Sequence, residues 1–280
     1  MSGAEVEPEV NPDLVSIKTG TEKLLLDFPA EAVARLTISN PSKRNALDHE
    51  ILDAITGVLS QLDRGIEARC LIITGADPMF SAGYDIGSIP NESFEQDAEA
   101  LVAHPFPAAL AALDAYPWPT VAALNGHCLG GGLELAITCD LRICARGAKL
   151  GMPPAKLGLI YGHTGLIRFI QTIGAPRTRE LFFMGRNISA ERADEINLIN
   201  EVVDDLPEAA IEVAAGIAAN APLSMKGNKQ AIGTILRNPV LTPGQEKELV
   251  ELRESCFGSE DFLEGITAFG EKRKPRWTGR

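Results

Sequence analysis

The chain has no long apolar run, no CxxC pair and no basic stripe that offsets its excess of acidic residues, and each absence excludes a class of protein. None of its apolar runs approaches the roughly 20 residues that a membrane-spanning helix needs. Its 280 residues carry 26 Lys and Arg against 38 Asp and Glu, a formal net charge of −12, which argues against binding nucleic acid. An anionic ligand must therefore meet a local group of basic side chains.

Signatures of metal and nucleotide sites are also missing. No cluster of His, Cys and carboxylates stands at metal-ligand spacing, so we expect no metal ion. There is no GxGxxG, no P-loop lysine and no GxSxG nucleophile turn. The five cysteines lie mostly inside apolar stretches, and no signal peptide pattern precedes them. We expect buried thiols in a soluble, cytoplasmic protein.

Strand-like stretches, small-residue turns and helix-like stretches recur in that order along the first part of the chain. This pattern predicts an α/β core over residues 14–205, preceded by a flexible tail over 1–13 that is rich in Glu and Pro. Residues 206–280 contain helical patterns with alanine-rich apolar faces, which indicate an oligomerisation region. Asp48 is expected to cap a helix over 51–62.

Periodic apolar positions predict further helices along the chain. Prolines interrupt the one expected over residues 100–115. The others are expected over 166–173, 176–184, 190–196, 207–220, 224–235 and 245–256.

The most informative stretch joins a strand over 121–124 to a helix through three adjacent glycines, Gly130 to Gly132. Glycines leave the backbone N–H groups uncovered, and a helix that starts near Gly131 points unpaired N–H groups and its positive dipole end at the same space. Glu134 falls in the first turn of that helix, where it could act as a base or hold a water molecule. The simpler interpretation is that Glu134 only caps the helix.

Four segments in register resemble one family. They are FSAGYDI at 80–86, NGHCLGGGLELAITCD at 125–140, the NPSKRNALD loop at 40–48 ahead of them and PAKLGL at 154–159 behind them. The chain is similar to the crotonase superfamily, the enoyl-CoA hydratases and isomerases, from its first predicted hairpin to the C-terminal EKRKPRW. The resemblance implies a spiral of ββα units followed by a helical trimerisation region, assembled as a homotrimer or homohexamer.

The resemblance also implies an acyl-CoA ligand, whose coenzyme A is part of the substrate, so no separate cofactor is expected. In such relatives the thioester oxygen lies between two backbone N–H groups, which here fall on Tyr84 and Gly131. Because these donors belong to the backbone, the Tyr84 side chain is free to form a wall of the acyl pocket. The positions that match the family's CoA contacts are Lys43, Arg44, Ala82, Tyr84, Asp85, Ile86, Gly87, Phe269 and Lys272, the last two often reaching a neighbouring subunit.

The sequence departs from the family at one catalytic position. Hydratases of the family use a second glutamate in a Pro-Glu pair, and this chain has Pro153-Pro154 there. Proline can neither donate nor accept a proton. A nearby tyrosine, Tyr161, resembles one in the methylmalonyl-CoA decarboxylase branch, where it could orient the departing carboxylate, although a core tyrosine is an equal alternative.

Four functions therefore stay open. The family default is hydration of a 2-enoyl-CoA with Glu134 handling the water, while Pro154 with Tyr161 favours decarboxylation of a malonyl-type CoA. An isomerase in which Glu134 alone moves the proton is the third possibility, and a non-catalytic CoA-binding oligomer is the fourth. The role of His163 is open.

Overall fold

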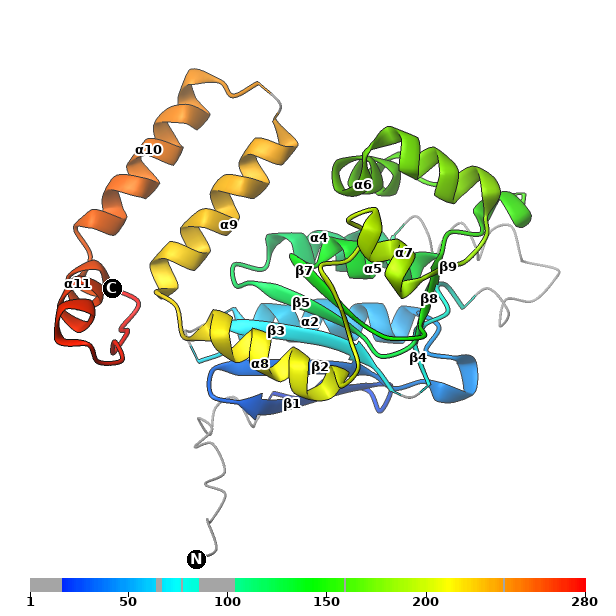
Figure 1. Ribbon diagram of the computed structural model, residues 1–280, viewed down its shortest axis with the longest axis horizontal. Coiled ribbons are helices and arrows are strands. Elements are labelled where there is room, and N and C mark those ends of the chain that lie inside the picture. The colour runs from blue at the N-terminus through cyan, green and yellow to red at the C-terminus, as the bar shows by residue number, and fades with distance from the viewer. Residues whose placement is uncertain (1–16, 64–66, 77, 86–103, 159, 239) are drawn as a thin grey trace, which may run out of the picture.

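The computed structural model describes residues 17–63, 67–76, 78–85, 104–158, 160–238 and 240–280 (Figure 1). Two sheets form the centre of the chain. The larger has the order β1-β2-β3-β5-β7-β10, and its strands are β1 (Leu24–Ala30), β2 (Val33–Ile38), β3 (Cys70–Gly75), β5 (Thr120–Leu124), β7 (Leu141–Ala145) and β10 (Glu201–Val203). The smaller has the order β4-β6-β8-β9, with β4 (Met79–Ser81), β6 (His127–Leu129), β8 (Lys149–Gly151) and β9 (Ile188–Ser189).

Successive strands alternate between the two sheets. The chain passes from β3 to β4, from β5 to β6 and from β7 to β8, so each pair places its first strand in the larger sheet and its second in the smaller one. A helix follows each pair, namely α4 (Pro105–Ala115), α5 (Gly131–Thr138) and α6 (His163–Met184). The strands β3, β5 and β7 pair in parallel within the larger sheet, and β4, β6 and β8 pair in parallel within the smaller one. This repeated ββα unit confirms the expected α/β spiral.

Alternating side chains of the larger sheet divide the core into two parts. In β3, Leu71 and Ile73 face one cluster and Cys70 and Ile72 the other, which is the two-residue period of a strand buried on both faces. The first cluster lies against α2 (His49–Leu62), α4 and α5, and α8 (Leu206–Ala218) covers the second (Figure 1). Burial on both faces explains why these strands read as continuous apolar runs.

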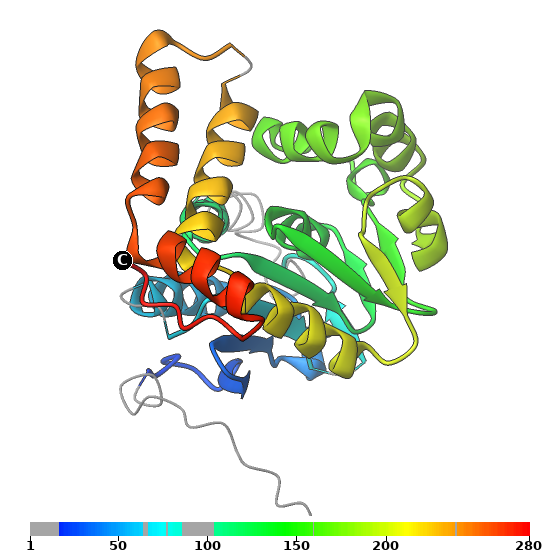
Figure 2. The ribbon, with the colours of Figure 1, turned by 60° about the vertical axis from the view of Figure 1, so that its left-hand side comes forward.

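The short helix α7 (Ala190–Glu195) packs on the core against β8, β9 and β10. The C-terminal helices α9 (Pro222–Arg237), α10 (Pro243–Phe257) and α11 (Glu260–Glu271) extend from this core. In both views α9 and α10 run side by side as a helical hairpin that projects from the sheets, and α11 turns back beside the core (Figures 1 and 2). Predicted helices over 224–235 and 245–256 are confirmed, whereas α11 was not anticipated. Apolar side chains on this region are exposed, among them Ile232, Ile235, Phe262, Leu263 and Ile266.

Two predicted helices differ in detail from the structure. Pro105 and Pro107 do not interrupt a helix, because α4 begins at Pro105 and places them in its first turn, where a missing N–H costs no helical hydrogen bond. Residues 100–103 of that expected helix lie outside the described residues, as does the tail over 1–13. The helices expected over 166–173 and 176–184 form one element, α6, with a kink at Gly174, whose φ is +71°.

Four of the five cysteines are buried and the fifth, Cys256, is half-buried, and all of them are free thiols. Burial raises the pKa of the Cys70, Cys139 and Cys144 thiols to about 12, so each stays protonated at neutral pH. Within the ranges that the structure describes, no helix combines the length and apolar character needed to cross a membrane.

Asp48 caps α2 as expected, and its replacement tests the contribution of that cap. Its side chain accepts a hydrogen bond from the Ile51 N–H at 2.9 Å. We expect D48A to lower the free energy of unfolding by about 1 kcal/mol because this N–H loses its partner. Urea denaturation measures the effect, and D53A, an exposed position on the same helix, is the control. Equal effects of both changes would contradict the role of the cap.

Candidate active site

The turn after β4 is fixed to the NPSKRNALD loop by backbone hydrogen bonds. Ala82 N–H donates to Arg44 O at 3.0 Å, Leu47 N–H to Gly83 O at 2.7 Å and Asp85 N–H to Leu47 O at 3.0 Å. These bonds extend the sheet by one isolated parallel bridge between Leu47 and Tyr84. The NPSKRNALD loop and this turn thus form one hydrogen-bonded unit.

Asn45 connects this unit to the rest of the chain. It is not among the site residues predicted from the sequence. Its buried amide donates to Ala76 O and Met79 O, both at 2.6 Å, and its Oδ1 accepts from Asn40 N–H at 2.9 Å. Ser81 Oγ donates to Asn45 O at 2.8 Å. An Asn in a polar loop is an ordinary turn residue by sequence, so only the fold distinguishes this one.

Two unpaired N–H groups meet beside this turn. β4 and β6 pair in parallel, so the turns that follow them lie next to each other. Gly83, with a φ of +96°, is so close to the second turn that a side chain on it would begin 3.1 Å from Gly131 N. Gly131 begins α5 as expected, and among the residues that the structure describes neither Tyr84 N–H nor Gly131 N–H has a backbone acceptor. Such a pair of donors is suited to an oxygen that gains negative charge.

The Tyr84 ring lies over the start of α5. A methyl group on Gly131 would lie 2.8 Å from Tyr84 Cε1, so this position leaves no room for a side chain. The other side of the ring packs edge-on against Phe106 of α4, with ring centroids 4.7 Å apart. Tyr84 therefore combines an available N–H with a side chain that bounds the same space.

Glu134 lies one turn into α5 and is only 4% exposed. Tyr161 Oη donates a hydrogen bond to Glu134 Oε2 at 2.5 Å, and the Tyr84 hydroxyl is close enough to affect both groups. Burial raises the pKa of Glu134, while the Tyr161 hydrogen bond and the positive charge of Arg168 oppose that rise. Burial likewise raises the pKa of both tyrosines, so their hydroxyls stay protonated and able to donate.

The first turns of α6 complete the surroundings of this carboxylate. A methyl group on Gly165 would lie 2.7 Å from Glu134 Oε1 and 2.6 Å from Tyr161 Cε1. Pro154 is buried in a short 3-10 helix, Pro154–Lys156, ahead of the loop that carries Tyr161. The tyrosine, not the proline position, therefore supplies the polar partner of Glu134. His163 is exposed at the first position of α6.

The predicted CoA contacts fall into three groups. Lys43 and Arg44 are exposed on the loop that holds Ala82, Tyr84 and Asp85, so the structure brings these five together. Ile86 and Gly87 lie outside the described residues.

Phe269, which is 88% exposed, and Lys272 lie at the end of α11. This helix packs against α10 and is apart from α5 in both views (Figures 1 and 2). Within one chain these two residues are not brought to the rest of the site.

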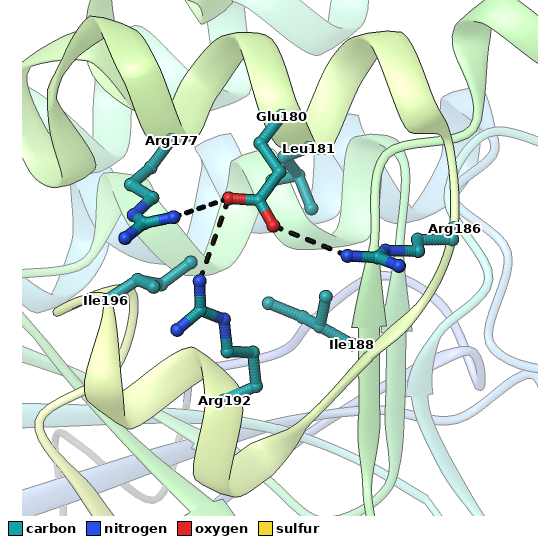
Figure 3. Close-up of a pocket in the computed structure, with 7 residues that line it drawn as sticks. All are labelled: Arg177, Glu180, Leu181, Arg186, Ile188, Arg192 and Ile196. Atoms are coloured by element: carbon teal, nitrogen blue, oxygen red, sulfur yellow. Dashed lines mark hydrogen bonds and ion pairs between the residues drawn. The ribbon is translucent and has the colours of Figure 1, made fainter.

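A small basic cluster on the second half of α6 is separated from this site by the kink at Gly174. Figure 3 shows the Glu180 carboxylate between three guanidinium groups, those of Arg177 at 2.7 Å, Arg186 at 3.4 Å and Arg192 at 3.7 Å. Because one carboxylate already pairs with all three arginines, the cluster connects α6, the segment between α6 and β9, and α7. In the described part of the chain no group of three or more His, Cys, Asp or Glu side chains could hold a metal ion.

Gly165 offers a direct test of how tightly α6 packs on Glu134. We expect G165A to lower the free energy of unfolding by about 1–3 kcal/mol, because the methyl group must displace either the carboxylate or the Tyr161 ring. Thermal and urea denaturation measure this. G162A, one residue before the same helix and without a contact shorter than 3.9 Å, is the matched control. A G165A protein as stable as G162A would show that the helix is not packed this closely.

Comparisons with known proteins agree with this architecture. A model of the enoyl-CoA hydratase/isomerase family matches residues 29–280. A short-chain-enoyl-CoA hydratase of Clostridium acetobutylicum is 34% identical over 246 residues, covering 86% of this chain and 92% of that protein. A 2,3-dehydroadipyl-CoA hydratase of Escherichia coli is 33% identical over 254 residues, covering 89% of this chain and 96% of that protein.

Solved structures agree as well. The crystal structure of an enoyl-CoA hydratase from Bacillus anthracis has a TM-score of 0.85 and 32% identity to this chain, covering 92% of it and 100% of that chain. Sequence and structure are thus similar over nearly the same residues. The chain therefore belongs to the enoyl-CoA hydratase/isomerase family of the crotonase superfamily.

Proposed function

We propose that the protein hydrates the double bond of a 2-enoyl-CoA thioester with a single carboxylate, Glu134, as its acid and base. The observation that carries this proposal is the hydrogen bond from Tyr161 to Glu134, together with the Tyr84 and Gly131 N–H groups, which have no backbone acceptor among the described residues. In this proposal the Glu134 carboxylate is the proton acceptor, the Tyr161 hydroxyl is a neutral donor and the two N–H groups bind the oxyanion. Two relatives support the same reaction, one at 33% identity named as a 2,3-dehydroadipyl-CoA hydratase and one at 34% identity named as a short-chain-enoyl-CoA hydratase.

The proposed reaction needs two proton transfers. The ionised Glu134 takes a proton from a water molecule, whose oxygen forms a bond to Cβ while the C=C electrons move to the thioester oxygen. Tyr84 N–H and Gly131 N–H stabilise the resulting enolate oxygen, each donor of this kind contributing about 3 kcal/mol. Glu134 then returns the proton to Cα. The Tyr161 hydroxyl holds the carboxylate in position and contacts the water in place of the missing second glutamate.

The same surroundings set the pH at which Glu134 works. A base must be ionised to accept a proton, and burial raises the pKa of Glu134 above its usual value. Hydration should therefore fall as the pH decreases through this raised pKa. In a plot of hydration rate against pH, a hydratase with one acid–base carboxylate would show one fall at low pH, its acidic limb, caused by Glu134. A second carboxylate would cause no further change in rate.

We further propose that CoA lies along the loop of Lys43 and Arg44, which offers basic groups next to the thioester site in an acidic chain. Phe269 and Lys272 would reach the nucleotide portion from a neighbouring copy, because α11 lies apart from α5 within one chain (Figure 2). The exposed apolar side chains of α9 and α11 provide a surface for that assembly as a trimer or hexamer. Residues 206–280 would then serve both assembly and substrate binding.

Decarboxylation of a malonyl-type CoA is the second candidate. Pro154 at the second glutamate position favours it, as does the raised pKa of Glu134, because a protonated carboxyl can donate to the enolate that remains after CO₂ leaves. The direction of the pH dependence distinguishes the two reactions. An acid catalyst loses activity as the pH rises through its pKa, which is opposite to the limb expected for hydration. An isomerase would use Glu134 alone on a 3-enoyl-CoA.

Removal of the carboxylate tests the role of Glu134. We expect E134Q to lower kcat for crotonyl-CoA hydration by about 10²–10⁴-fold, because the amide cannot accept the proton of water. Loss of enoyl absorbance measures the rate, and binding of CoA should be retained. A variant with full hydratase activity would contradict this role. If the wild-type protein instead releases CO₂ from methylmalonyl-CoA, the second candidate replaces the first, and binding without turnover of either indicates a non-catalytic protein.

Tyr161 is tested by removing only its hydroxyl. We expect Y161F to move the acidic limb of hydration to higher pH, because the lost hydrogen bond no longer favours the ionised form of Glu134. The plateau rate should also fall, by about tenfold or more, as the water loses one contact. Y116F, which alters a buried core tyrosine at the C-terminal end of α4, is the matched control. A limb that stays in place in Y161F while Y116F behaves the same would refute the role of this hydroxyl.

A further inference from the structure

Arg168 lies on α6, one helical turn after Gly165, the residue of that helix that contacts Glu134. Gly165 packs directly against the Glu134 carboxylate, and residues three apart on a helix share a face. Arg168 therefore lies on the side of α6 that faces α5. Its side chain is 24% exposed, so its guanidinium is largely withdrawn from water.

An aspartate on a third element holds this arginine. Asp114, near the end of α4, lies with its Oδ1 3.5 Å from Arg168 Nη1 and its Oδ2 3.3 Å from Arg237 Nη1. Arg237 is the last residue of α9, and a hydrogen bond of 2.9 Å from Gln171 Nε2 to Leu236 O ties the same two helices. One carboxylate thus joins α4, α6 and α9.

The arrangement is not that of an ordinary surface ion pair. Exposed pairs contribute little to stability, and the Asp114–Arg237 pair, with side chains 38% and 57% exposed, is of that kind. Arg168 is the less exposed of the two arginines, and it faces a second carboxylate, Glu134, that is 4% exposed and has no ion-pair partner of its own among the residues described. In partly buried surroundings an opposite charge acts over longer distances than it does in water.

We propose that Arg168 is a positioning residue that keeps the Glu134 carboxylate charged and ready to accept a proton, and that Asp114 and Arg237 hold Arg168 in place from α4 and α9. The described groups that face Glu134 are the Tyr161 and Tyr84 hydroxyls and the Arg168 guanidinium, with Asp114 and Arg237 behind it. Of these, the positive charge of Arg168 lowers the pKa of Glu134 and so opposes the effect of burial. The C-terminal helical region thereby gains an electrostatic connection to the base.

The inference rests on the proposed function only for the choice of assay. The pH profile of kcat/KM for crotonyl-CoA is measured for the wild type and for R168M. We expect the acidic limb of R168M to move to higher pH, with kcat/KM on that limb about threefold or more below the wild type. R168K keeps the charge and should keep most of the wild-type profile. R177M, an equivalent change on the same helix beyond the kink, should leave the profile unchanged.

A second measurement does not depend on turnover. Infrared titration follows the Glu134 carboxyl band, which is identified by its absence in E134Q, and its midpoint should be higher in R168M than in the wild type. An unchanged midpoint in folded R168M overturns the inference. If R168M does not fold, R168Q decides: it removes the charge but keeps amide donors for Asp114, and its midpoint should likewise move to higher pH, so an unchanged midpoint refutes the proposal. A wild type without hydratase activity but with these midpoints refutes only the proposed function.

Discussion

The close approach of two glycine-containing turns is the constraint on which the rest of this site depends. Parallel pairing of β4 with β6 places the turn through Gly83 against the turn through Gly131, with room for backbone only. Asn45 and the NPSKRNALD loop hold the first turn in place through hydrogen bonds to backbone groups. Two N–H donors are therefore preorganised by the sheets, and no side chain has to move to create them.

The second feature is a buried carboxylate whose charge is balanced by several neighbours. Burial favours the protonated form of Glu134, and the Tyr161 hydroxyl with the Arg168 guanidinium favour the ionised form. Opposing contributions of this kind bring a carboxylate toward the range where it can both accept and return a proton. The family relationship establishes the fold, whereas the balance around Glu134 comes from the particular side chains that pack on it.

Local patterns in the sequence were sufficient for much of the fold. The apolar strand over 121–124, the Asp48 cap and the helix start at Gly131 follow from short-range rules that the structure obeys. Prolines at 105 and 107 were misjudged because the same residue breaks a helix interior and begins a helix. Helix α11 was missed because glycines at 265 and 270 interrupt a segment whose Ser259 cap becomes visible only in the folded chain.

For the candidate site, the sequence alone determined which groups are present: Glu134 in the first turn of α5, backbone donors at Tyr84 and Gly131, and proline at 154. Only the tertiary structure decided which of them meet. The Tyr161 contact to Glu134, the Asn45 anchor and the Arg168–Asp114–Arg237 connection join segments 27 to 123 residues apart in the chain. Such contacts have no local signal, because they arise from the sheet pairing and helix packing that bring distant segments together.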